Sequence, residues 1–354
     1  MPVLSERMKS LLDQVLTRNA SDLHMMVGTA PILRIDGKLA TIPDEAVLSE
    51  ADCEELIGSM LLETHMEILK HRKELDFSFG YKDLRFRTNV YYQKGTLAAS
   101  LRSISSVIRS FAELGLPPII ERFATNSQGF VLITGPTGHG KTTTLASMIE
   151  HINITRSEHI VTIEDPIEYV FNNKKSIISQ REVGSDTNTF ARALRASLRE
   201  DPNVVLIGEM RDLETIETAL TIAETGHLVF ATLHTNSASQ TADRIINVFP
   251  PHQQQQVRQQ LASVLLGIVS QRLMPRVQGG RIVASEIMLA STAVRSLIRE
   301  GKTYQLPNVI QTSASEGMIS LDKVLAELVS KGEITIDDAL TWATDPKAFK
   351  MMIY

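Results

Sequence analysis

The sequence predicts an α/β protein of two domains, in which an α+β unit with an antiparallel sheet precedes a larger unit with a mostly parallel sheet. The chain has 354 residues, enough for two separate hydrophobic cores. Up to about residue 103, the strand-like segments alternate apolar and polar residues. From Gly129 onward, short and almost wholly apolar segments alternate with helical ones, which is typical of a parallel sheet covered by helices on both faces.

The first part of the chain contains one clear helical pattern and several strands. Apolar residues recur at helical spacing from Leu4 to Leu16. The segment "PILRIDGKLATI" predicts a hairpin around Asp36 and Gly37, and "ELDFSFGYKDLRFRTNVYYQ" predicts two strands joined between Gly80 and Asp83. "TLAASLRSI" is a further strand. We assign residues 1–103 to the first domain, 104–118 to a linker and 119–354 to the second domain.

The second part reads as strands separated by helices. The predicted strands are "GFVLITG", "EHIVTIEDP", "NVVLIGE", "HLVFATLH" and "GRIVASEIML". We assign all five to a parallel sheet that is covered by helices on both faces. From Ile319 the pattern predicts small helices.

Composition and charge exclude several kinds of site and segment. The net charge of -5 gives no bulk attraction to nucleic acid, and the single cysteine, Cys53, excludes an internal disulfide and a Cys-x-x-Cys zinc site. The first residues do not resemble a signal peptide, and the longest apolar run, "LASVLLGIV", is about half of a bilayer-spanning helix. We therefore expect a soluble, cytoplasmic protein that contacts membranes only through partners.

A glycine-rich loop carries the strongest chemical signal. "GPTGHGKT" fits G-x-x-x-x-G-K-[ST] between an apolar strand and a helix, the context in which such a loop cradles phosphates. Lys141 is expected to reach the β and γ phosphates of ATP or GTP, and Thr142 to bind Mg²⁺. His139 is expected to face solvent or touch phosphate lightly. The predicted nucleotide-binding residues are Gly135, Pro136, Thr137, Gly138, His139, Gly140, Lys141, Thr142 and Thr143.

Acids and histidines end the neighbouring strands. Glu164 follows one strand, whereas the next ends in Gly208 and Glu209, with glycine where such strands usually carry aspartate. His227 and His234 lie at opposite ends of one strand, more than about 20 Å apart, too far for one metal ion. For His234 a contact to phosphate or to an interface is expected; for His227 both a structural and a functional role remain open.

Together these stretches resemble the secretion ATPase superfamily, and within it the retraction ATPases of type IV pili. The motifs are "GPTGHGKTTT", "TIEDPIEYV", "REDPNVVLIGEMRDLET" and "TGHLVFATLHTNSA", with "SDLHMMVGTAPILRIDGKL", "SQRLMPR" and "STAVRSLIREGK" matching further along. The resemblance implies a PAS-like N-terminal domain, a RecA-like motor and a homohexamer at the cytoplasmic face of the inner membrane, at the pilus base. It also implies as partners a membrane platform protein and a paralogous pilus ATPase, with no nucleic acid.

Roles for individual residues follow from the same resemblance. Glu164 would activate water and Glu209 would serve Mg²⁺, with the assignment of the two glutamates still open. His234 would sense the γ phosphate or the subunit interface. The catalytic residues that the resemblance implies are Glu164, Glu209, His234, Arg85, Arg87 and Arg102; the arginines would reach a neighbouring subunit's nucleotide, although by pattern alone they are outward strand charges. In "AVRSLIRE", Arg295 and Arg299 are expected to share an exposed face.

Two other functions compete with retraction. The extension and type II secretion ATPases carry a tetracysteine zinc module, which a chain with one cysteine cannot form. A RecA-like nucleic-acid translocase would show basic or aromatic channel loops, but aromatic residues make up only 5% of this sequence. The end of the chain resembles both the retraction ATPase and its accessory paralogue, which leaves the choice between those two roles open.

Overall fold

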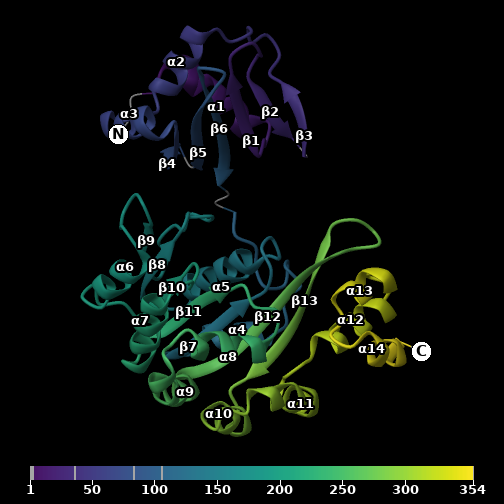
Figure 1. Cartoon of the computed structure of the whole chain (residues 1–354). Helices are drawn as coiled ribbons and strands as arrows, with labels where there is room; N and C mark the ends of the chain where they lie inside the picture. Colours follow the sequence, from purple (N-terminus) through teal and green to yellow (C-terminus); the bar gives the residue numbers. More distant parts are fainter. Residues whose placement is uncertain (1–3, 36, 83, 105–106, 354) are drawn as a thin grey trace. The chain divides into compact units, whose positions relative to one another are not determined.

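The computed structural model describes residues 4–35, 37–82, 84–104 and 107–353. It divides into two compact units, one formed by residues 1–107 with Glu168–Val170 and the other by the rest of the chain (Figure 1). Each unit has its own core. Among the described residues, no helix is long and apolar enough to cross a membrane.

The first unit is a six-stranded antiparallel sheet with the order β3-β2-β1-β6-β5-β4 and three helices. Its elements are α1 (Glu6–Thr17), β1 (Asp22–Met26), β2 (Ile32–Ile35), β3 (Lys38–Thr41), α2 (Glu50–Gly58), α3 (Glu63–Arg72), β4 (Glu74–Tyr81), β5 (Leu84–Gln93) and β6 (Thr96–Ile104). The predicted helix and hairpin strands are present, while β1, α2 and α3 had not been predicted. The predicted turn residues Asp36 and Asp83 lie outside the described residues.

One face of this sheet is covered and the other is polar. Met8, Leu11 and Leu12 of α1 pack with Leu23, Phe86 and other inward residues of the strands in one core. Because strand side chains alternate between faces, the residues between them, including four arginines, lie on the opposite face.

The second unit is a seven-stranded sheet with the order β13-β12-β7-β11-β10-β8-β9. Its strands are β7 (Gly129–Thr134), β8 (His159–Glu164), β9 (Ile177–Glu182), β10 (Val204–Ile207), β11 (Leu228–Leu233), β12 (Leu265–Pro275) and β13 (Arg281–Leu289). The helices are α4 (Ile119–Ala124), α5 (Lys141–Thr155), α6 (Phe190–Ser197), α7 (Leu213–Glu224), α8 (Ala238–Asn247), α9 (Pro251–Val264), α10 (Thr292–Arg299), α11 (Leu306–Thr312), α12 (Leu321–Ser330), α13 (Ile336–Trp342) and α14 (Pro346–Ile353), with 3-10 turns η1 (Thr303–Gln305) and η2 (Ala314–Glu316).

Both faces of this sheet are buried, which explains its continuous apolar strands. In β7, Phe130 and Leu132 belong to the core beneath α6 to α10, whereas Val131 and Ile133 belong to the core beneath α4 and α5. The segment 108–116, which we had assigned to the linker, is also part of this unit, since Phe111 and Leu114 pack against the second of these cores and Leu116 is buried in it.

Three details differ from the predicted strands. The segment "GRIVASEIML" forms β13, which pairs antiparallel with β12 and is therefore not part of the parallel set. The apolar run from Leu261 is divided, because α9 ends at Val264 and β12 begins at Leu265. Edge strand β9, "IISQRE", was missed because its polar residues give no apolar run.

Candidate active site

The predicted loop and acids lie where four parallel strands end. β7, β11, β10 and β8 are neighbours in that order and all run in the same direction. The phosphate loop follows β7, His234 follows β11 and Gly208 with Glu209 follows β10, while Glu164 is the last residue of β8. Open parallel sheets bind ligands at such an edge. The fold therefore brings the loop, both glutamates and His234 to one side of the sheet.

The loop has the backbone that a phosphate cradle needs. Gly135, Gly138 and Gly140 all have positive φ, at 139°, 80° and 80°. A Cβ on Gly135 would lie 2.3 Å from the carbonyl oxygen of Gln271, and one on Gly140 would lie 3.0 Å from Gln271 Nε2. Glycine is thus favoured by the conformation at all three positions, and at Gly135 it is also required by the close approach of the β12 backbone.

Lys141 is buried beneath this loop at the start of α5. Its Nζ donates hydrogen bonds to the carbonyl oxygens of Gly135, at 2.7 Å, and Pro136, at 2.9 Å. These are carbonyls of the same loop whose amides face a phosphate in this motif. The ammonium group is therefore already positioned at the loop, with only 8% of the residue exposed.

His139 has a different environment from the predicted one. Its Nδ1 accepts a hydrogen bond from the Leu273 N–H at 3.0 Å, and its carbonyl accepts one from Gln271 Nε2 at 2.7 Å. Its ring packs edge-to-face on Trp342, with 5.0 Å between centroids. Burial, with the charges of Arg272, Lys141 and Arg281, lowers the pKa of the imidazole. The ring is half-buried and attaches the loop to β12 and α13, a role that the sequence did not predict.

Glu164 is held at the end of β8 with only 5% of its surface exposed. Its Oε1 accepts hydrogen bonds from Thr162 Oγ1 at 2.6 Å and from Gln180 Nε2 at 3.2 Å. Thr162 lies on β8 and Gln180 on the neighbouring β9, so two adjacent strands hold the carboxylate in place. A buried and oriented carboxylate of this kind suits a base that acts on one bound water molecule.

The neighbouring strand explains why glycine precedes Glu209. A Cβ on Gly208 would lie 3.2 Å from the carbonyl oxygen of Ile163 and 3.3 Å from the Cα of Glu164. An aspartate at this position would therefore require the backbone of β8 to shift by a few tenths of an ångström. The acid of this strand is displaced to Glu209.

His234 connects Glu209 to the phosphate loop. Its Nε2 lies 3.1 Å from Glu209 Oε1, and its Nδ1 lies 3.4 Å from both Lys141 Nζ and Thr137 Oγ1. Glu209 Oε1 also accepts from Arg211 Nε at 2.6 Å. Burial raises the pKa of Glu209, but its contacts with Arg211 and His234 outweigh burial and lower it. The carboxylate is therefore ionised at neutral pH.

His227 lies at the opposite end of β11. Its Nδ1 is 3.0 Å from the carbonyl oxygen of Ile222 and 3.0 Å from Thr225 Oγ1, both near the end of α7. These contacts hold the imidazole against the end of α7, away from the loop.

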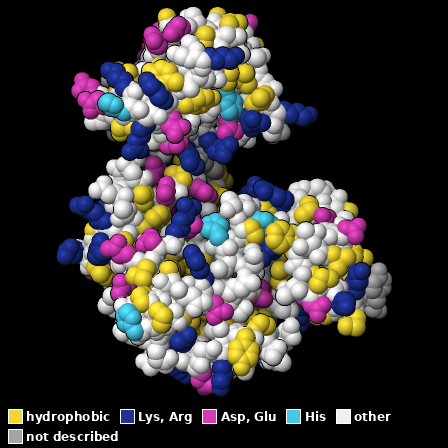
Figure 2. Space-filling model, viewed as in Figure 1, with side chains coloured by type: hydrophobic (Ala, Val, Ile, Leu, Met, Phe, Trp, Pro, Cys, Tyr) yellow, Lys and Arg dark blue, Asp and Glu magenta, His cyan; other side chains and the backbone are white. Residues whose placement is uncertain are grey.

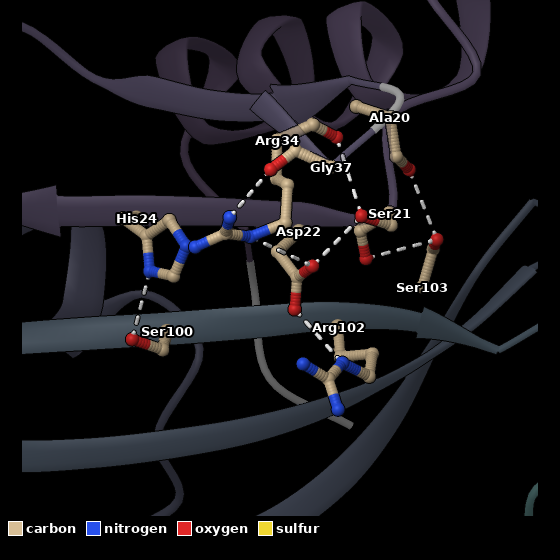
Figure 3. A network of polar contacts seen from close by, with 9 residues as sticks. All are labelled: Ala20, Ser21, Asp22, His24, Arg34, Gly37, Ser100, Arg102 and Ser103. Carbon is tan, nitrogen blue, oxygen red and sulfur yellow. Dashed lines mark hydrogen bonds and ion pairs between the residues drawn. The ribbon is translucent and has the colours of Figure 1, made fainter. Parts of the chain in front are cut away.

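The predicted arginines lie together on the polar face of the first unit. Arg87 and Arg102 are directly paired across β5 and β6, and Arg85 follows on the same face of β5. Arg102 Nε donates to Asp22 Oδ1 at 2.8 Å, and Arg34 Nε lies 3.7 Å from Asp22 Oδ2, so two guanidinium groups approach one carboxylate (Figure 3). Asp22 is buried, while 69% of the Arg102 side chain is exposed.

Sequence reasoning missed several residues of the site. Gln271 bridges the loop and α5, since its Oε1 also accepts from Thr144 Oγ1 at 2.8 Å. Arg272 is 2% exposed and donates to the Asn236 carbonyl oxygen at 2.9 Å, beside His234. The sequence signal that could have identified them is the polar Gln-Arg pair within the mostly apolar segment that forms β12.

Comparison with known proteins agrees with this geometry. The model of the family described as "Type II/IV secretion system protein" matches residues 2–338. The chain belongs to this family. The "Type IV pilus retractation ATPase PilT" of Pseudomonas aeruginosa is 45% identical over 94% of this chain and 96% of its own length. The "Type IV pilus ATPase PilU" of the same organism is 36% identical over 98% of this chain and 91% of its own.

Solved structures give the same result. The crystal structure described as the "Pilus Retraction Motor PilT and Bound ADP" superimposes with a TM-score of 0.91, at 48% identity over 97% of this chain and 98% of that one. The ATPase DotB of Legionella pneumophila follows with a TM-score of 0.76 at 26% identity, covering 96% and 95% of the two chains. The predicted family is confirmed, and with it the α/β fold and an ATPase activity.

Proposed function

We propose that this chain is the hexameric motor that retracts type IV pili, converting ATP hydrolysis into movement of its domains. One observation carries the proposal: Lys141 of the loop and Glu209, which lies just after β10, each contact one nitrogen of His234. Such an arrangement joins the group that binds phosphate to a group that serves the metal ion. The same chain is 45% identical to PilT and 36% identical to PilU, which favours the retraction role over the accessory one.

Hydrolysis follows from the residues at the strand ends. Lys141 would exchange the carbonyls of Gly135 and Pro136 for the β and γ phosphates, where its charge stabilises the transition state. Glu164 would orient and deprotonate the attacking water. The hydroxyl of Thr142 and the carboxylate of Glu209, the latter through water, are the hard oxygen donors that Mg²⁺ prefers, and the ion would neutralise charge on the transferred phosphate.

The two units would have separate tasks. We assign the second to a RecA-like motor and the first to a PAS-like domain that supplies Arg85, Arg87 and Arg102 to the nucleotide of a neighbouring subunit. In the chain as described, Arg102 donates to Asp22. To reach a phosphate, its guanidinium would leave that carboxylate for a more highly charged anion, an exchange that Coulomb attraction favours.

A pilus motor also needs partners at the membrane. We propose that the hexamer works at the cytoplasmic face of the inner membrane, on a platform protein and beside a paralogous ATPase. On the face drawn in Figure 2, Lys and Arg side chains are interspersed with Asp and Glu. Mixed charge of this kind suits protein partners better than the phosphate backbone of a nucleic acid.

Deletion of the gene separates retraction from extension. If the chain retracts pili, the deletion strain carries more surface pili than the parent and has lost surface motility. Loss of pili would assign the chain to extension instead. The control is complementation with the parent gene, which restores both properties, beside complementation with Lys141→Ala, which restores neither.

A further inference from the structure

The C-terminal helices reach the phosphate loop through one side chain. Trp342 is the last residue of α13 and the only tryptophan of the chain. The ring of His139 meets it edge-to-face at 5.0 Å, with 73° between the ring planes. On the same indole, the Cζ of Arg272 lies 4.9 Å from the ring centroid. Trp342 thus contacts both the phosphate loop and β12.

Each partner of Trp342 is itself fixed to the nucleotide site. His139 belongs to the loop and accepts from the backbone of Leu273. Arg272 donates to the carbonyl oxygens of Gln271, at 2.9 Å, and Asn236, at 2.9 Å. Asn236 is two residues beyond His234. The indole therefore lies against two groups that hold the loop and the segment after β11 in place.

The C-terminal helices also hold Trp342 in a defined position. Leu321, Leu325 and Phe349 pack with Met274 and Ala284 of the β12–β13 hairpin in a separate small core. Two and three residues beyond Trp342, the N–H groups of Thr344 and Asp345 donate to Asp322 at 2.7 and 3.2 Å. This buried carboxylate at the start of α12 fixes the chain where α13 ends.

From these contacts we infer that Trp342 is a positioning residue for the phosphate loop and makes the C-terminal helices part of the nucleotide site. The inference rests on nucleotide binding at the loop. A loop that occupies its binding conformation in only a fraction of molecules binds its ligand more weakly by that fraction. Aromatic and cation–π contacts of this size stabilise such a conformation by roughly three- to tenfold in population.

Titration of the purified full chain with ADP tests the inference. Tryptophan emission reports on Trp342 alone, and calorimetry gives the ADP affinity independently. In the parent, emission changes on adding ADP and saturates at the calorimetric affinity. Trp342→Ala weakens ADP binding by roughly three- to tenfold, whereas Trp342→Phe, which keeps an aromatic ring, stays within about twofold.

A variant of the same helix separates positioning from general loss of structure. Leu340 packs against the C-terminal core. Leu340→Ala is expected to lower thermal stability at least as much as Trp342→Ala and to keep the parental ADP affinity. Equal weakening in both variants, or parental affinity in Trp342→Ala, would overturn the inference. If calorimetry detected no ADP binding by the parent, the assignment of the loop would fail, and this inference with it.

Discussion

Replacing Arg295 should destabilise the second unit, although the amphipathic pattern of its helix had placed this residue on an exposed face. The Arg295 side chain is half-buried, and burial lowers its pKa. Its Nε donates to the Ala290 carbonyl oxygen at 2.9 Å, and its Nη atoms donate to Ser263 and Leu265 at 2.7 Å and to Ala262. One guanidinium thus satisfies the carbonyls where α9 ends and β12 begins.

The size of the effect follows from these four acceptors. A hydrogen bond from a charged donor contributes about 1.5–3 kcal/mol, but water can reach part of this half-buried site and replace some of the lost partners. We therefore expect Arg295→Ala to lower the free energy of unfolding by about 2–4 kcal/mol, which for a unit of this size lowers Tm by roughly 5–15 °C. The assay is thermal unfolding followed by circular dichroism.

Arg299→Ala is the matched control. Arg299 lies on the same helix and is exposed, so its replacement should change stability by less than about 0.5 kcal/mol. An Arg295→Ala variant as stable as Arg299→Ala would refute the structural role. A test of whether this helix transmits force to a partner should accordingly use Arg299→Ala alone, in cells at parental expression.

Three further results are expected. Glu164→Gln should bind ATP but hydrolyse it at least about 100-fold more slowly, whereas Glu209→Gln should raise the Mg²⁺ requirement in a steady-state ATPase assay; the opposite pattern would exchange the two roles. Mixed rings of Lys141→Ala and Arg102→Ala chains should regain part of the activity that each pure variant lacks, and no recovery in rings shown to be mixed would argue against arginine contribution between subunits. Because burial lowers the pKa of His139 from 6.5, the unfolded chain binds a proton at this residue more readily than the folded chain does. The free energy of unfolding, measured in denaturant titrations, should therefore fall as the pH drops from 7.5 to 5.5, and it should fall less steeply in His139→Gln. Equal pH dependence in the two proteins would contradict a bonded, neutral imidazole.

The local parts of the site could be predicted from sequence because each is a short segment with its own signal. The phosphate loop has a fixed spacing, Glu164 ends one apolar strand, and Glu209 lies two residues beyond the end of another. Parallel strands bring their carboxyl ends to one edge of the sheet, so these residues were expected at the same edge. His234 was placed by the same reasoning.

What could not be predicted depends on partners distant in sequence. The environment of His139 depends on Leu273 and Trp342, and that of Arg295 depends on the end of α9. No periodicity in the sequence predicts those contacts. The boundary between α9 and β12 was missed for a related reason. Residues on both sides of Val264 are apolar and buried, so only tertiary pairing decides where helix gives way to strand.

Imaging of single labelled pili in living cells tests the central claim most directly. The deletion strain is complemented with the parent chain or with Lys141→Ala, and individual pili are followed through extension and withdrawal. We predict that pili extend in both strains but withdraw at the normal frequency only with the parent chain. Withdrawal at the parental frequency in cells that contain only Lys141→Ala would contradict a retraction motor powered by ATP at this loop.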